Sequence, residues 1–318
     1  MNQHKTDLFS SQKIIHGDCL EKMRNVESNS IDCILTDPPY GLNFMGKHWD
    51  KGIPGVEFWK EALRISKPGA HLLAFGGTRT YHRLVCAIED AGWEIRDCLM
   101  WIYGSGFPKG KTCLKPAWEP IILSRKKGNV RHLNIDECRI GTHEYSQDQW
   151  SKKGLSRVTG NDYGIHKPSD TELPKGRWPA NILFDEEAAA MLDEHTGNRP
   201  SSSGIRERKA KNINTLSGPQ TEGNFESYGD FGGASRFFYC AKASSAERGE
   251  FNRHPTVKPV KLLEYLLKLI MPPSQNAVVL DPFMGSGSTL VAAKNLGFNA
   301  IGIEIEKDYC EIASKRLS

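Results

Sequence analysis

Short apolar segments alternate with amphipathic ones over the first 125 residues of the chain. The apolar segments have the length and continuity of buried strands. They fall at 13–16, 31–36, 71–75, 98–103 and 121–123. Between them, apolar residues recur at helical spacing and predict helices over 20–26, 58–66 and 80–91. This alternation predicts a mostly parallel sheet with helices on both of its faces.

The same pattern returns near the C-terminus. Residues 277–281 form a short apolar segment that predicts a strand, and a turn containing Gly285 and Gly287 follows it. A helix is expected over 290–296, and Gly297 ends it, as a glycine just past a helix commonly does. A second strand is predicted over 300–304.

The middle of the chain has a different character. From 126 to 235 the periodicity fades, and Gly, Ser, Asn, Thr and charged residues dominate. Only a strand within 177–184 and a helix over 185–194 are predicted there. Such a long irregular stretch inside a compact domain is usually functional. The sequence therefore divides into 12–125, an irregular insertion at 126–235, and 236–318.

Composition narrows the class of protein. The 318 residues carry a formal charge of +4 with a pI near 8.5, which permits a polyanionic partner without requiring one. No segment is long enough to span a bilayer, and the N-terminus lacks the apolar core of a signal peptide. The eight cysteines include no C-x-x-C pair, so neither a zinc site nor a disulfide framework is expected. These features favour a cytoplasmic protein that binds no metal and no membrane.

The first candidate site is Asp37-Pro38-Pro39-Tyr40, directly after the strand at 31–36. Open α/β folds place their chemistry at the carboxyl ends of such strands. The two prolines remove backbone donors and stiffen the turn, so the carbonyls there stay free to accept hydrogen bonds. Asp37 adds a carboxylate acceptor and Tyr40 a flat ring. Together these groups suit an exocyclic amino group on a planar ring, although a tight turn alone would also explain them.

The second candidate site combines the glycine turn at 282–287 with Glu304 at the end of the next strand. Glycines before a helix allow a ligand to approach the backbone closely, and a carboxylate about twenty residues later can accept from ribose hydroxyls. A dinucleotide site would need a third glycine where Leu290 stands, and the chain has no phosphate-binding P-loop. Asp281 would repel a pyrophosphate but pair with an amino group. This layout favours S-adenosylmethionine (AdoMet).

Taken together, the two motifs resemble the DNA amino-methyltransferases, which methylate adenine N6 or cytosine N4. The Asp-Pro-Pro-Tyr motif precedes the cofactor glycines here, which resembles the β class of that family. The resemblance implies a circularly permuted AdoMet-dependent methyltransferase fold, with a mostly parallel seven-stranded sheet. Residues 14–20 resemble the segment that contacts the cofactor adenine, and 254–259 the segment that helps hold its methionine end. Residues 101–109 and 114–120 resemble the remaining core segments, with Trp118 where many relatives carry histidine.

The resemblance also implies roles for individual residues. The catalytic residues would be Asp37, Pro38, Pro39 and Tyr40. The cofactor would contact Asp18, Cys19, Thr256, Lys258, Asp281, Phe283, Gly285, Ser286, Gly287, Thr289 and Glu304. Within this set Glu304 would hold the ribose hydroxyls, Asp18 the adenine amino group, and Lys258 the methionine carboxylate.

The implied function is site-specific methylation of adenine N6 in double-stranded DNA, with the target base flipped out of the duplex. Asp at the head of the tetrad favours adenine in this family, and cytosine N4 is the alternative. A nucleic-acid-binding module with a defective catalytic site is an alternative from another class. The region 126–235 would read the DNA sequence, with basic residues at 206–211 on phosphates or in a solvated loop. Phe44 and Trp49 are candidates to line the base pocket; a homodimer and a cognate restriction endonuclease stay open.

Overall fold

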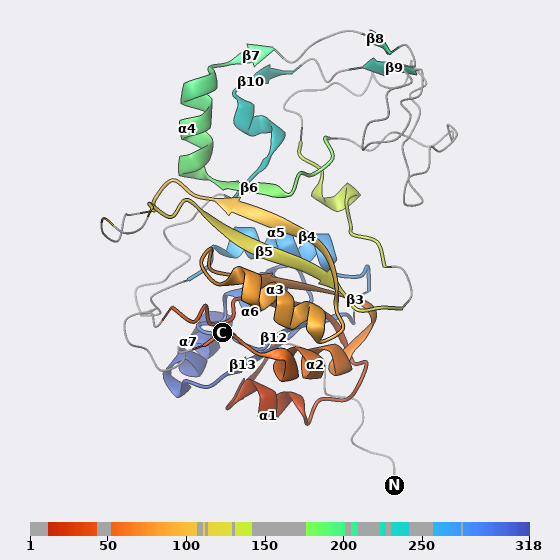
Figure 1. Cartoon of the computed structure of the whole chain (residues 1–318), viewed down its shortest axis with the longest axis vertical. Helices are drawn as coiled ribbons and strands as arrows, with labels where there is room; N and C mark the ends of the chain where they lie inside the picture. Colours follow the sequence, from red (N-terminus) through yellow and green to blue (C-terminus); the bar gives the residue numbers. More distant parts are fainter. Residues whose placement is uncertain are drawn as a thin grey trace.

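The computed structural model describes residues 12–42, 52–106, 111, 114–128, 131–141, 176–200, 205–208, 223–226, 230–241, 257–274 and 276–318. One large sheet with strand order β1-β13-β12-β2-β3-β5-β4-β6-β11 forms its centre, with helices on both faces (Figure 1). Six of its neighbouring strand pairs are parallel, and only the two pairs that involve β5 are antiparallel. The predicted α/β fold with a mostly parallel sheet is confirmed.

The strands of this sheet are β1 Gln12–His16, β2 Ile31–Thr36, β3 Ser66–Phe75, β4 Glu94–Ile102, β5 Trp118–Arg125, β6 Ile182–Asp185, β11 Tyr239–Ala241, β12 Val278–Asp281 and β13 Asn299–Glu304. The helices are α1 Cys19–Met23, α2 Val56–Ile65, α3 Tyr81–Asp90, α4 Glu186–Thr196, α5 Val260–Ile270, α6 Ser288–Asn295 and α7 Lys307–Leu317. Short strands β7 Arg199–Pro200, β10 Phe231–Gly232, β8 Ile205–Arg208 and β9 Gly223–Glu226 form two small separate sheets.

The expected number of seven strands is wrong, because the sheet has nine strands in the described residues alone. Seven of the nine, from β1 to β4 in spatial order, are the strands of the predicted sheet. The segment between β5 and α5 adds two more: β6 pairs in parallel with β4, which would otherwise be an edge strand, and β11 pairs with β6. An open edge strand offers unpaired backbone groups, and the insertion satisfies those of β4.

Two apolar cores cover the two faces of the sheet. One is formed around α5 and α6, with Val279 and Leu35 from the sheet. The other lies under α2 and α3 and includes Trp59, one of the largest fully buried side chains. The predicted helices cover only part of these faces, because α5 and α7 were not expected. Strand β2 is buried along its whole length, which agrees with its four apolar residues, and its polar residues Asp32 and Thr36 are paired with Lys67 and Asp281.

Strand β3 begins five residues earlier than expected, directly where α2 ends. The helix predicted over 58–66 was expected to include Ser66, yet Ser66 already pairs with Ile31 of β2. The register then shifts before Cys33 pairs with His71, so the pairing of β2 and β3 is interrupted at 67–70. Lys67 lies in this interruption and places its ammonium 2.7 Å from the buried carboxylate of Asp32.

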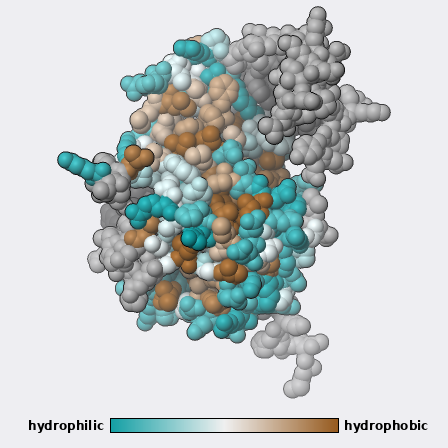
Figure 2. All heavy atoms as spheres, viewed as in Figure 1, coloured by the Kyte–Doolittle hydropathy of each residue, from teal (hydrophilic) through white to brown (hydrophobic). Residues whose placement is uncertain are grey.

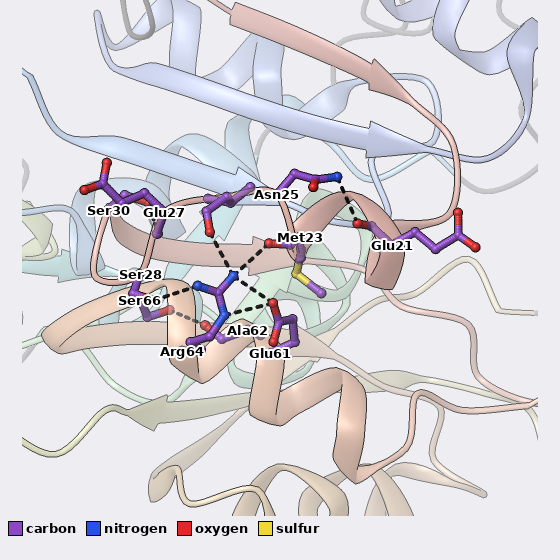
Figure 3. A network of polar contacts seen from close by, with 11 residues as sticks. Glu21, Met23, Asn25, Glu27, Ser28, Ser30, Glu61, Ala62, Arg64 and Ser66 are labelled. Carbon is purple, nitrogen blue, oxygen red and sulfur yellow. Dashed lines mark hydrogen bonds and ion pairs between the residues drawn. The ribbon is translucent and has the colours of Figure 1, made fainter. Parts of the chain in front are cut away.

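Arg64, in the last turn of α2, fixes the connection from α1 to β2 (Figure 3). Its guanidinium donates to the carbonyls of Met23 at 3.0 Å and Val26 at 2.8 Å, and to Ser28 Oγ at 2.6 Å. Glu61 holds the same guanidinium at 2.7 Å. These bonds satisfy carbonyls near the end of α1 and hold the start of β2 in place.

Part of the insertion stands above the sheet edge as an upper lobe that contains α4, β7 and β10 (Figure 1). The basic residues at 206–211 and most of the predicted recognition region are outside the part whose side chains are described. Figure 2 shows a mixed surface on this face, where hydrophilic residues surround smaller hydrophobic areas. Among the described helices, none has the length and apolar character required to cross a bilayer.

Candidate functional site

The two sequence motifs meet at one edge of the sheet. Strand β2 pairs with β12, with Leu280 opposite Ile34, so their carboxyl ends lie side by side. Thr36 Oγ1 donates to Asp281 Oδ1 at 2.8 Å and ties the two strand ends together. The expectation that the strand at 278–281 is central and adjacent to the strand at 31–36 is confirmed.

A cavity of about 460 Å³ opens at this edge, and side chains from both motifs line it. The lining includes these predicted residues: Asp18, Cys19, Asp37, Pro38, Pro39, Tyr40, Lys258, Asp281, Phe283, Gly285, Ser286, Thr289 and Glu304. Gly287 lies beside the cavity as the N-cap of α6. Thr256, Phe44 and Trp49 lie outside the described residues. The structure therefore gathers the described candidates of the two motifs in one place.

The glycine turn is held against the end of β13 by Glu304. The Gly285 N–H donates to Glu304 Oε2 at 2.8 Å, and the Glu306 N–H donates to Oε1 at 2.8 Å. Gly285 and Gly287 have φ values of 53° and 82°, in the left-handed region that favours glycine. Burial raises the pKa of Glu304, against the lowering effect of these N–H bonds. Each carboxylate oxygen still has a lone pair for a ligand hydroxyl.

Asp281 is a buried acid on the floor of the cavity, and its side chain is 3% exposed. It accepts from Thr36 and from the Phe283 N–H at 3.1 Å. Burial raises its pKa to about 6, the hydrogen bonds from Thr289 and Thr36 oppose the shift, and the charge of Asp37 adds to it. A buried carboxylate of this kind gains from a cationic ligand, which would replace the water it has lost.

Asp18 and Cys19 begin α1 at another wall of the cavity. Asp18 Oδ1 accepts from the Glu21 N–H at 3.0 Å and caps the helix. Burial, with the neighbouring Asp18 charge, raises the pKa of the Cys19 thiol to about 12. Cys19 is therefore a neutral, apolar part of the wall and not a nucleophile.

The Asp-Pro-Pro-Tyr turn is held by short hydrogen bonds. The Tyr40 hydroxyl donates to Asp37 Oδ1 at 2.6 Å, and Thr80 Oγ1 donates to the Tyr40 carbonyl at 2.7 Å. The backbone of Gly77 packs against the Tyr40 ring, since an added Cβ there would lie 3.1 Å from ring atom Cδ2. One side of the ring is thus covered, and Tyr40 also lines the cavity.

Lys258 joins this group from the segment just before α5. Its ammonium lies 2.7 Å from Asp37 Oδ2, 3.1 Å from Glu119 Oε2 and 3.2 Å from the Tyr40 hydroxyl. Burial opposes its charged form, but the carboxylates of Asp37 and Glu119 raise its pKa above the ordinary value. Burial and the same two carboxylates also raise the pKa of Tyr40. Lys258 was predicted to bind the carboxylate of the cofactor; its partners in the structure are Asp37, Tyr40 and Glu119.

Sequence reasoning missed several residues of the cavity. Glu119 and Trp118 come from the segment 114–120, which was recognised as a family segment but received no role. Tyr103 and Pro116 also line this side, and Tyr81 packs edge-on against Trp118 with ring centroids 6.0 Å apart. At the other end Ile305, 54% exposed, and Tyr309 complete the wall after Glu304. Ile305 could have been predicted as a wall residue, because it is an apolar residue directly after Glu304 at the end of β13.

Comparison with known proteins identifies the family. The sequence model of the family described as "DNA methylase" matches residues 31–315, which is most of the chain. The chain belongs to this DNA methylase family. The predicted resemblance to the N6/N4 DNA amino-methyltransferases is thereby confirmed.

Type II methyltransferases are among the relatives that match nearly the whole chain of this DNA methylase. The type II methyltransferase M2.DpnII of Streptococcus pneumoniae is 49% identical over 96% of this chain and 88% of its own length. The type II methyltransferase M2.LlaDCHI of Lactococcus lactis subsp. cremoris is 38% identical over the same shares. Among solved structures, PvuII DNA methyltransferase (cytosine-N4-specific) matches 98% of this chain and 87% of its own with a TM-score of 0.56. At 16% identity that last likeness shows the fold alone.

AdoMet is the cofactor of this DNA methylase family, and DNA is its substrate. The groups around the cavity suit AdoMet, which is cationic at its sulfur and α-amino group and carries no phosphate. Asp281 supplies a buried negative charge, and Glu304 supplies acceptors beside the glycine turn. Phe283 and Ile305 add apolar surface to the wall of the cavity. Among the described residues, no group of three or more His, Cys, Asp or Glu side chains is arranged to hold a metal ion.

Proposed function

We propose that this DNA methyltransferase transfers the methyl group to N6 of adenine in a specific sequence of double-stranded DNA, with the target base flipped out of the helix. The observation that carries the proposal is the position of Asp37 and Tyr40, which share one cavity with the glycine turn and Glu304. An enzyme that acts on a base edge inside a duplex must first extrude that base, and Tyr40 offers a flat surface to receive it.

The tetrad would prepare the amino group for attack. The lone pair of an exocyclic amine is delocalised into the ring, so the amine is a weak nucleophile. Asp37 would accept one N–H and the Pro38 carbonyl the other, which favours the pyramidal nitrogen of the transition state. Tyr40 would stack on the ring, and Pro39 would keep the turn rigid. AdoMet supplies an electrophilic methyl group. Correct placement of the amine against this group should therefore account for much of the rate enhancement.

Different residues of the cavity would bind different parts of AdoMet. Asp281 would pair with the α-ammonium group, Glu304 would accept from the ribose hydroxyls, and Asp18 would accept from the adenine amino group. Phe283 and Cys19 would pack on the adenine. The remaining predicted contacts, from the turn and from the segment before α5, are Thr256, Lys258, Gly285, Ser286, Gly287 and Thr289.

Adenine is favoured over cytosine because Asp heads the tetrad, a choice that leans towards adenine in this family. Cytosine N4 presents the same amino geometry and stays the second candidate. The region 126–235 would read the target sequence. The enzyme would act as a monomer or as a homodimer, alone or beside a cognate restriction endonuclease. A binding module without catalysis would require a defect in the tetrad or in the cofactor turn.

The test is to incubate the protein with methyl-labelled AdoMet and unmethylated DNA and to identify the labelled base by mass spectrometry. We expect N6-methyladenine at one sequence. Label in N4-methylcytosine would support the second candidate. DNA binding without any transfer would instead support the binding module.

The matched variant is Asp37→Ala. It should bind AdoMet and DNA almost as the parent does, while its single-turnover rate falls by about 10²–10³ or more, because a preorganised acceptor is lost. Tyr40→Phe keeps the flat ring and should retain much of the activity. An Asp37→Ala enzyme within about tenfold of the parent rate would show that the chemistry lies elsewhere.

A further inference from the structure

Glu119 is a second carboxylate beside the catalytic one, and no role follows for it from the transfer described above. It lies on β5 in register with Trp101 of β4, and its side chain reaches the cavity. Its Oε2 atom lies 3.1 Å from Lys258 Nζ and 3.3 Å from the Tyr40 hydroxyl. Its side chain is 22% exposed, so the group is partly removed from water.

Asp37 and Glu119 therefore share two donors, one ammonium and one hydroxyl. Lys258 lies 2.7 Å from Asp37 Oδ2, and the Tyr40 hydroxyl lies 2.6 Å from Oδ1. Both carboxylate oxygens of Asp37 are thus engaged before a substrate arrives. Each Asp37 oxygen keeps a lone pair for an N–H of the target amine, but the ammonium of Lys258 beside Oδ2 weakens that oxygen as an acceptor.

A lysine side chain that is 11% exposed cannot leave its partner at low cost unless another acceptor is close. Glu119 is such an acceptor, because it already contacts the same Nζ atom. With Glu119 present, the ammonium can move towards Oε2 and stay paired while Asp37 turns to the amine. Without it, the ammonium would remain on Asp37 Oδ2 and weaken that oxygen as an acceptor.

We infer that Glu119 is a positioning residue for methyl transfer, which acts by holding the ammonium of Lys258 away from Asp37 when the target amine binds. The inference rests on the proposed role of Asp37 as acceptor of the amine and applies equally to adenine and cytosine. The charged state of Lys258, which the two carboxylates stabilise, is consistent with it.

The experiment is a double-mutant cycle of Glu119→Gln and Lys258→Met, measured as single-turnover rates at saturating AdoMet and DNA. Glu119→Gln alone should lower the rate by about tenfold or more, as expected for groups in one network. Its AdoMet dissociation constant should stay within about twofold, because the residue is not assigned to the cofactor. In the Lys258→Met background the same change should alter the rate by less than about twofold.

The control is Glu94→Gln, which removes the charge from another carboxylate that pairs across the same two strands, 2.8 Å from Arg125. Its transfer rate should equal that of the parent. Glu119→Asp keeps a carboxylate and should recover part of the rate; this comparison decides the matter if Lys258→Met abolishes transfer.

A Glu119→Gln rate within about twofold of the parent, or an equal loss in both backgrounds, would overturn the inference alone. If Lys258→Met is inactive, the inference would also be overturned by a Glu119→Asp variant whose transfer rate falls as far as that of Glu119→Gln. If the parent itself transfers no methyl group to DNA, the proposed function fails, and this inference fails with it.

Discussion

At the scale of single residues, Asp281 makes the cofactor site sensitive to pH. Burial raises its pKa to about 6, above the ordinary value of 3.8. Between these values the folded chain binds a proton that the unfolded chain has released. Asp281 therefore contributes less to stability as the pH rises through this window. Binding of an ammonium ligand should instead strengthen as the pH rises, because the ligand pairs with the ionised form of Asp281.

We therefore expect AdoMet affinity to fall as the pH is lowered through about 6. Calorimetric titrations between about pH 5 and 7.5 would measure it. Asp281→Asn should bind AdoMet weakly at both ends of this range and lose this component of the pH dependence. A parent affinity that is the same at both ends would contradict the assignment of Asp281 to the ammonium group.

The residues of the two motifs could be predicted because each motif is short and follows a strand. Asp37 and Asp281 come directly after or at the end of apolar runs, and the fold brings such positions to one edge. The group formed by Lys258 and Glu119 could not be predicted in this way. It depends on side chains from the segment before α5, from β5 and from the tetrad, and the spacing of residues along the chain does not report their contacts.

At the scale of elements, the start of α6 depends on Gly287 for two separate reasons. Its φ of 82° lies in the left-handed region, where other residues are strained by about 1–2 kcal/mol. In addition, an added Cβ would lie 2.8 Å from the Cβ of Ala313 in α7. Gly297 at the other end of α6 has a similar φ of 75°, but an added Cβ there meets nothing within 4 Å.

Gly297→Ala is therefore a matched control for Gly287→Ala. Both variants should lose stability through backbone strain, by about 1–2 kcal/mol in denaturant unfolding. Gly287→Ala should lose more, because α7 or the cofactor turn has to shift, and its AdoMet affinity should fall as well. Equal losses in the two variants, with unchanged AdoMet binding, would show that the contact with Ala313 is easily relaxed.

The central strands were predicted better than the edge of the sheet. The bounds of β2 agree with the expected 31–36, since a strand that is buried on both faces is mostly apolar. A strand was expected within 177–184, and β6 covers Ile182–Asp185 next to the edge strand β11. Its partners β4 and β11 come from distant segments, and their pairing leaves no periodic signal in the sequence.

At the scale of the whole molecule, the two ends of the chain build one half of the sheet. Strand β1 pairs with β13, and β12 pairs with β2, so the first and last segments of the chain interlock. Helix α7 packs against β1, and Gln12 donates to the Phe298 carbonyl at 3.0 Å. The end of α7 therefore lies at the same end of the sheet as the start of β1.

This arrangement predicts that the order of the two halves can be exchanged. A permuted chain would begin before α5, run through α7, continue through a linker of about six residues into Gln12, and end after β11. Every strand pairing of the large sheet is kept, so the permuted chain should fold and bind AdoMet within about threefold of the parent affinity. Circular dichroism and calorimetry would measure both properties.

A second permutant with the same linker, opened between Val279 and Leu280 inside β12, should fail to bind AdoMet because that break removes the central strand. If the first permutant folds but binds no AdoMet, the cofactor site needs chain continuity between β11 and α5, and the sheet pairings alone do not define it.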